Sequence, residues 1–159
     1  MATTLTAATL TVTLSESITL NGRNQGGTNI KTYASIAEVT KRILTITTAE
    51  SVIATFSSAV ASAGHYIAAD VRYIRFTNLD DTNFITLTFR NQDNDEAAIK
   101  LDAGQSFIWN ADNSGGMVDV LNATQDADAA SDTALGDLTN IQADANTGSC
   151  DLEMFIASV

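Results

Sequence analysis

Polar and apolar residues alternate along much of the chain with the period of two that is typical of half-buried strands. Near the start, Leu10, Val12 and Leu14 are separated by threonines. Similar runs predict further strands over residues 42–48, 52–56, 71–78, 83–90, 99–101, 107–109, 117–121, 138–144 and 150–159. About eight to ten short strands and little helical periodicity favour an all-β fold, and we expect an antiparallel β-sandwich of jelly-roll type.

Two pairs of these strands are close enough in sequence to predict hairpins. The run Val71–Asn78 and the run ending at Arg90 are joined by a short turn rich in Asn and Asp. Near the end of the chain, Leu138–Asp144 and Cys150–Val159 are joined by a turn that contains Asn-Thr-Gly. Short turns of this composition are typical of adjacent antiparallel strands. We therefore expect both pairs to be hydrogen-bonded hairpins.

The segment before Arg42 has a less regular pattern. Leu5 to Leu20 predicts one or two strands, Asn21 to Asn29 predicts a loop rich in Gly and Asn, and a helical turn is expected just after Ile36. The first strand is either an edge strand of the domain or an arm that pairs with a neighbouring subunit. We treat 1–159 as a single sandwich domain, with residues 1–8 as an extended arm in the second interpretation.

The charge distribution argues against anionic partners. The net charge is -11; all eight Lys and Arg residues lie between Arg23 and Lys100, and ten acids with no base follow from Leu101 onward. Phosphate binding needs clustered cations, so neither nucleic acid nor an anionic membrane surface is an expected partner. The beginning of the chain lacks the basic region of a signal peptide, which favours synthesis in a cytoplasm.

Composition also indicates what the outer faces of the strands contact. The chain has 22 threonines and no proline, and only 17% of its residues are charged. Threonine in place of lysine and glutamate at outward positions favours faces that touch neighbouring subunits rather than water alone.

Residues with catalytic or metal-binding chemistry are sparse. His65 is the only histidine and Cys150 the only cysteine, which we expect to be a small apolar residue in the last strand. A histidine base needs a nucleophile and an orienting group, and a zinc site needs more ligands. We expect no enzyme activity and no cofactor or metal.

Two acidic segments resemble calcium loops only superficially. They are Asn91–Glu96 and the cluster of Asp126, Asp128 and Asp132. Neither has the ligand spacing, glycine and final glutamate of an EF-hand. We expect solvated loops, with a weak calcium site between subunits as the alternative.

The candidate partner contacts are Trp109 and the aspartates Asp126, Asp128 and Asp132. Trp109 either fills the core or lies on a sheet face against a partner. The loop Asp126–Gly136 is acidic and poor in hydrophobic residues, which is typical of an exposed, partner-facing segment.

Several sheet and turn segments together carry a family resemblance. They are Val71–Asn78, Phe84–Leu87, Ile99–Phe107 with its Ala103-Gly104-Gln105-Ser106-Phe107 turn, Leu138–Ala143 and Cys150–Val159. In this order they resemble small β-sandwich virion proteins of tailed bacteriophages. The resemblance covers core and turn positions over roughly residues 71–159, so it transfers no functional residue.

The resemblance implies a structural role in a virus particle. We expect an oligomeric capsid decoration or cement protein, made in the host cytoplasm and located in the virion. Its partners would be further copies of itself, a trimer among the options, and virion proteins such as the major capsid protein. One alternative is a tail or fibre component. Another is a carbohydrate-binding module, for which the aromatic residues would be Trp109, Tyr33, Tyr66 and Tyr73.

Overall fold

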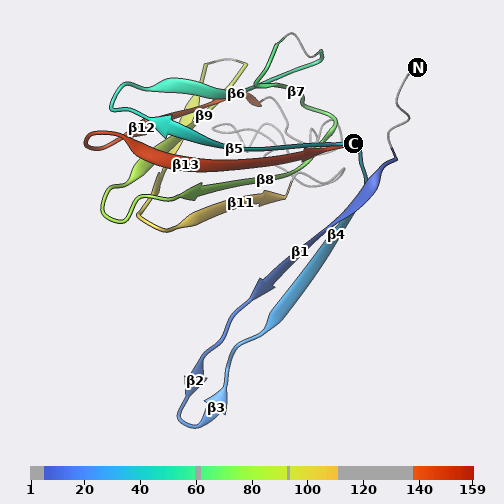
Figure 1. Cartoon of the computed structure of the whole chain (residues 1–159), viewed down its shortest axis with the longest axis vertical. Coiled ribbons are helices and arrows are strands. Elements are labelled where there is room, and N and C mark those ends of the chain that lie inside the picture. Colours follow the sequence, from blue (N-terminus) through green and yellow to red (C-terminus); the bar gives the residue numbers. More distant parts are fainter. Residues whose placement is uncertain (1–5, 60–61, 93, 111–137) are drawn as a thin grey trace.

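The computed structural model describes residues 6–59, 62–92, 94–110 and 138–159, and these residues form a β-sandwich with a projecting two-stranded arm (Figure 1). One sheet of the sandwich has the strand order β11–β8–β13–β5 and the other has β10–β9–β12–β6–β7. The strands of the first sheet are β5 (Glu38–Ile46), β8 (Val71–Asn78), β11 (Ser106–Asn110) and β13 (Cys150–Ser158). Those of the second are β6 (Ser51–Ser57), β7 (His65–Ile67), β9 (Ile85–Asn91), β10 (Glu96–Leu101) and β12 (Leu138–Ala145).

The chain passes repeatedly from one sheet to the other. Strand β5 is followed by β6 in the opposite sheet, and the same crossing occurs from β8 to β9, from β10 to β11 and from β12 to β13. Every pairing among these eight strands is antiparallel, and the short β7 adds to β6 in parallel. This wrapping is that of a jelly roll, so the expected fold class is confirmed.

Both predicted hairpins are wrong. Strand β8 pairs with β11 and β13, whereas β9 pairs with β10 and β12. Likewise β12 and β13 lie in different sheets, and their inward side chains meet across the core. A short polar turn can join two strands across a sandwich as well as within a sheet. The buried amide of Asn78 helps to set the first crossing, because it donates to the carbonyl oxygens of Asn83 (2.8 Å) and Leu101 (3.1 Å).

The main core lies between the two sheets. Its largest fully buried side chains include Phe76, Phe89, Ile141 and Met154. Trp109 is 8% exposed and packs edge-on against Phe89, with ring centroids 5.8 Å apart. Of the two interpretations of Trp109, the structure therefore supports the core position.

The arm is one long β-ribbon formed by the segment that precedes the sandwich. Strands β1 (Ala8–Ser15) and β4 (Thr28–Ile36) pair along its length, and β2 (Thr19–Leu20) pairs with β3 (Arg23–Asn24) near its tip. Asn21 and Gly22 turn the chain with φ values of 51° and 75°, as a two-residue hairpin turn requires. At Gly26, a Cβ atom would lie 2.1 Å from the Glu16 carbonyl oxygen, so only glycine fits there.

The arm corrects two expectations about the beginning of the chain. Residues 21–29 are the tip and return path of the ribbon rather than an open loop, and the residues after Ile36 continue into β5 rather than into a helical turn. The projecting element extends to Ile36. Most of the segment 1–8 that was expected as an extended arm lies outside the described residues.

Candidate interaction surface

The two faces of the arm differ in chemistry. The register of β1 and β4 places Leu10 opposite Tyr33, Val12 opposite Lys31, and Leu14 opposite Asn29, so these six side chains share one face. We call it the apolar face of the arm. The opposite face carries Thr11, Thr13 and Ser15 from β1 and Thr28, Ile30 and Thr32 from β4, and we call it the threonine face. The ribbon is therefore amphipathic.

The base of the apolar face packs on the outside of the sandwich. Tyr33 and Ile36 of β4 are buried in a cluster with Tyr73 of β8 and Ala157 of β13, on the outer face of the sheet β11–β8–β13–β5. The Tyr33 and Tyr73 rings lie 6.0 Å apart, and Phe155 packs edge-on to Tyr73 at 5.8 Å. Burial raises the pKa of Tyr73, against a smaller opposing effect of the neighbouring guanidinium. The outer face of this sheet thus has its own small core, separate from that of the sandwich.

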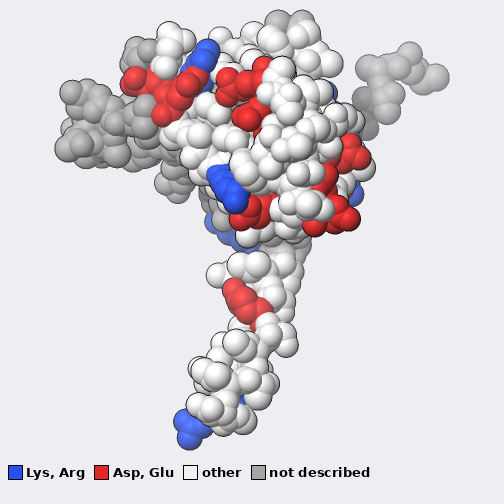
Figure 2. Space-filling view, turned by 90° about the vertical axis from the view of Figure 1, so that its left-hand side faces the viewer, with Lys and Arg blue, Asp and Glu red and all other residues white. Residues whose placement is uncertain are grey.

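Beyond its base the arm leaves the sandwich, and its apolar side chains become exposed. Leu14, Ile18 and Leu20 are 52%, 54% and 59% exposed. Where the arm separates from the sheet, a groove of about 280 Å³ is lined by Val12, Leu14, Asn29 and Lys31 of the arm and by Ile108 of β11. Figure 2 shows the arm as a narrow projection with few charged side chains, in contrast to the acidic patches on the sandwich.

An ion network lies on the same outer face of the sheet. The Glu153 carboxylate accepts from Arg75 at 2.5 Å and pairs with Lys41 at 3.1 Å. Hydrogen bonds from Arg75 first, and then from Lys41, lower the pKa of Glu153. On this face Lys41 lies between two exposed apolar residues of β5, Val39 and Ile43.

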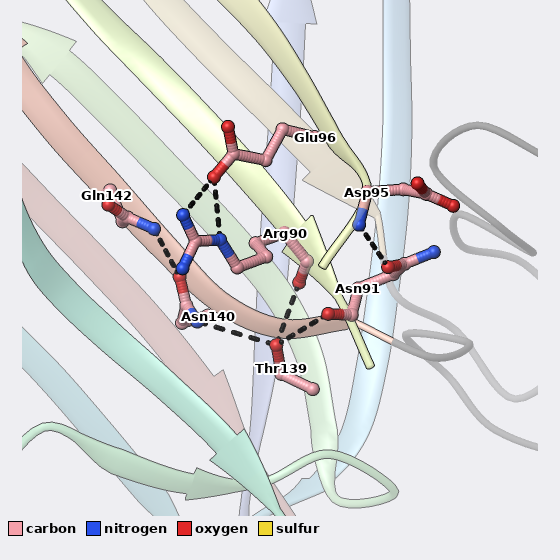
Figure 3. Close-up of polar contacts among 7 residues, drawn as sticks. All are labelled: Arg90, Asn91, Asp95, Glu96, Thr139, Asn140 and Gln142. Carbon is pink, nitrogen blue, oxygen red and sulfur yellow. Dashed lines mark hydrogen bonds and ion pairs between the residues drawn. The ribbon is translucent and has the colours of Figure 1, made fainter. Parts of the chain in front are cut away.

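The outer face of the other sheet is polar (Figure 3). Arg90 of β9 pairs with Glu96 of β10, and Gln142 donates to Asn140 at 3.1 Å along β12. Thr139 donates to the carbonyl oxygen of Arg90 at 3.1 Å, where the register of β9 and β12 shifts. These side chains satisfy one another and the sheet backbone, so the face offers no apolar docking area at this cluster.

Two described residues of the first acidic segment, Asn91 and Asp95, close a turn by hydrogen bonding to each other. The Asn91 side-chain oxygen accepts from the Asp95 backbone N–H at 2.8 Å, and the Asn91 N–H donates to the Asp95 carbonyl oxygen at 3.0 Å. Glu96 belongs to β10 and is paired with Arg90. Within the described ranges, no three His, Cys, Asp or Glu residues are grouped so that they could hold a metal ion.

His65 lies beside the groove between β5 and β6. It starts β7 and lines a groove of about 500 Å³ with residues of β5 and β6. Arg42 lines this groove and donates from Nη2 to the Ile53 carbonyl oxygen at 3.0 Å, which links β5 of one sheet to β6 of the other. The lining residues are Arg42, Leu44, Thr45, Ile46, Ser51, Val52, Ile53, Ala54, Thr55, Ala63, Gly64 and His65, which include neither a cysteine nor a carboxylate.

The aromatic residues considered for sugar stacking are all buried. Tyr33, Tyr66 and Tyr73 are 4%, 5% and 4% exposed, and Trp109 is 8% exposed. Sugar stacking needs an accessible ring face, which none of the four offers. Cys150 is also buried, as expected for a small apolar residue at the start of β13.

The structure describes only one of the predicted partner contacts. Trp109 belongs to the core, and Asp126, Asp128 and Asp132 lie outside the described residues, as does most of the segment after β11. The sequence pattern predicts Leu10, Val12 and Leu14 as part of an edge strand or an arm, but it does not show which apolar residues of the arm are exposed. The Asn21-Gly22 dipeptide between two alternating runs was the available signal, because it is the strongest short-range mark of a hairpin.

No protein-family model, curated protein or solved structure matches this chain. In the part of the chain that the structure describes, no helix is long and apolar enough to cross a membrane.

Proposed function

We propose that this chain is a structural subunit of a tailed-bacteriophage virion, and specifically an oligomeric capsid decoration or cement protein. The observation that carries the proposal is the amphipathic arm, which projects from a jelly roll and exposes Leu14, Ile18 and Leu20 beyond the sheet that covers its base. Apolar groups concentrated on a projecting element are typical of a contact with another protein.

The mechanism of such a subunit is mechanical. The sandwich supplies a rigid body, and the arm carries an apolar contact surface away from it. Neighbours in a shell would be further copies of this chain and the major capsid protein. A stable interface of standard size buries roughly 800 Å² on each partner, and the arm contributes the apolar part of such an area.

The sequence resemblance to small phage β-sandwich proteins agrees with this role. The buried state of Tyr33, Tyr66, Tyr73 and Trp109 weakens the carbohydrate-binding alternative, because no stacking platform remains among them.

The test is the copy number of the protein in purified particles from its source, measured by quantitative mass spectrometry with the major capsid protein as internal standard. We expect hundreds of copies per particle. Tens of copies or fewer would overturn the capsid assignment in favour of a tail or fibre component. Absence from particles would refute a virion role altogether.

A further inference from the structure

We propose that the groove between β5 and β6 binds an extended segment of another polypeptide, which adds to the free edge of β5 as a further strand. The segment carries a carboxylate that pairs with Arg42 and an apolar residue two positions away. This contact goes beyond the proposed function, because it involves the sandwich rather than the arm. It is tested on the isolated full chain, independently of particle incorporation.

The two sheets of the sandwich differ in width by one strand. Each strand of the sheet β11–β8–β13–β5 has a counterpart at the same place in the order β10–β9–β12–β6–β7, whereas β7 has no counterpart among the described strands. The groove of about 500 Å³ lies where that counterpart would be, between β5, β6 and His65 at the start of β7. One added strand beside β5 would make the sheets equally wide.

The backbone along this groove is available for strand addition. β5 has nine residues and pairs with β13 on one side, and on its other side no described strand pairs with it. On the opposite wall, β7 pairs with β6 only from Thr55 onward, so residues 51–54 of β6 also lack a neighbour there. An unpaired strand edge offers a row of N–H and C=O groups, to which an extended peptide can hydrogen-bond.

Arg42 supplies the charge that selects the occupant. Its side chain is half-buried, and its one hydrogen bond within the described ranges is that from Nη2 to the Ile53 carbonyl oxygen at 3.0 Å. Gly64 leaves room beside the guanidinium, because a Cβ atom there would lie 3.4 Å from Nη2. The described residues that line the groove include no carboxylate. The groove therefore presents an unpaired cation in a protein whose net charge is -11.

A charge that points inward from an edge strand discriminates between incoming strands. A strand with an apolar or basic side chain beside Arg42 would cover the guanidinium without a counter-charge, which is costly. A carboxylate at the same position would accept a charge-assisted hydrogen bond from the guanidinium. Arg42 therefore disfavours most extended segments and favours an acidic one.

Leu44 sets the second requirement for the occupant. Arg42 and Leu44 are two residues apart in β5, so their side chains lie on the same face of the strand. Both line the groove, and Leu44 packs against the main core. The residue of an added strand that lies two positions from the carboxylate comes beside Leu44, where an apolar side chain fits.

A nuclear magnetic resonance titration of the full chain tests the proposal with a designed peptide. The peptide Thr-Val-Thr-Glu-Thr-Val-Thr, with both termini blocked, places an apolar residue two positions from the carboxylate in either strand direction. We expect it to shift the amide signals of β5 and of residues 63–65. The matched peptide with Lys in place of Glu should not bind. No shift in β5 at millimolar peptide, or equal binding of the two peptides, would overturn the proposal.

Substitution of Arg42 tests its role in selection. Arg42→Gln should weaken binding of the Glu peptide about tenfold, as expected for the loss of a partly buried charge pair. The matched control is Lys41→Gln, which makes the same change of charge on the outer face of the same strand, where Lys41 pairs with Glu153. Arg42→Glu should reverse the preference and favour the Lys peptide. Circular dichroism checks that each variant is folded. Equal effects of Arg42→Gln and Lys41→Gln would refute the assignment.

Hydrogen exchange distinguishes strand addition from binding of a carboxylate alone. The Glu peptide should slow exchange of the β5 amides that β13 leaves unpaired, and β11, the other edge strand of the sheet, should stay unchanged. Acetate, which offers the carboxylate without a backbone, should protect neither strand. Binding of the Glu peptide without protection in β5 would contradict strand addition.

Discussion

Truncating Tyr33 should release the arm while the sandwich stays folded. The Tyr33 ring is 4% exposed and packs against Tyr73 at the base of the arm. It belongs to the cluster on the outer face of the sheet and not to the core between the sheets. Tyr33→Ala therefore removes an anchor of the arm without opening a cavity in the main core.

The expected size of the effect follows from the burial of this ring. Replacing a buried aromatic side chain by alanine costs about 3–5 kcal/mol, which includes the loss of an aromatic pair. Since about 1.4 kcal/mol corresponds to a factor of ten, the open state of the arm should become roughly a hundredfold to a few thousandfold more populated. A hairpin without tertiary contacts is only marginally stable, so the released arm should lose its hydrogen-bond protection.

Hydrogen exchange followed by mass spectrometry measures this change segment by segment. We expect faster exchange in β1 and β4 of the Tyr33→Ala variant, by about a hundredfold or to the rate of an unprotected chain, with β9 and β12 unchanged. Ile30→Ala is the matched control on the exposed face of the same strand. Equal loss of protection in the arm and in β9 and β12 would refute the reasoning, because it would show that arm and sandwich unfold as one unit.

Four further predictions concern the sandwich. Asn78→Ala should lower the free energy of unfolding by about 2–3 kcal/mol in urea titrations, because it leaves buried backbone groups without their hydrogen bonds. The cations that pair with Glu153 lower its pKa in the folded protein. The stabilisation that ionised Glu153 contributes is therefore present above the pKa of the unfolded state and is lost as pH falls through the lowered folded pKa. Glu153→Gln should therefore reduce the fall of the urea midpoint at acidic pH. Burial, and then the charge of Glu50, raise the pKa of Asp144, so ionised Asp144 destabilises the folded protein at neutral pH. Asp144→Asn should therefore raise the urea midpoint at neutral pH. The gain should disappear as pH falls through the raised pKa of Asp144. Burial also raises the pKa of Cys150, so a thiol reagent should label this residue only at the rate of unfolding, and rapid labelling of the folded protein would contradict its placement.

The alternation of residues predicted the strands better than it predicted their partners. In β8, Tyr73 and Arg75 alternate with Ile74 and Phe76, and the structure places the two pairs on opposite faces. The same alternation is found in a hairpin and in a crossing between sheets. The choice depends on contacts distant in sequence, such as the hydrogen bond from Asn78 to the Leu101 carbonyl, which no local pattern contains.

The arm and the candidate contacts show the same limit. Leu10, Val12 and Leu14 have the pattern of any half-buried strand, and nothing local indicates that the covering sheet ends between Val12 and Leu14. Tryptophan is found both in cores and at protein contacts, so the identity of Trp109 does not decide between them. The deciding neighbour, Phe89, comes from a strand of the opposite sheet. Exposure depends on where other segments stop, which is a property of the fold.

The separation of the two hydrophobic clusters makes the fold of the sandwich independent of the distal arm. The first strand of the sandwich is joined to the last by its own hydrogen bonds, beginning with the Ala37 N–H and the Ser158 carbonyl oxygen at 2.9 Å. The distal arm therefore contributes nothing to the closure of the sandwich. Substitutions in the distal arm would change the surface that the subunit presents without loss of the sandwich fold, whereas substitutions of Tyr33 or Tyr73 would detach the arm from the sheet.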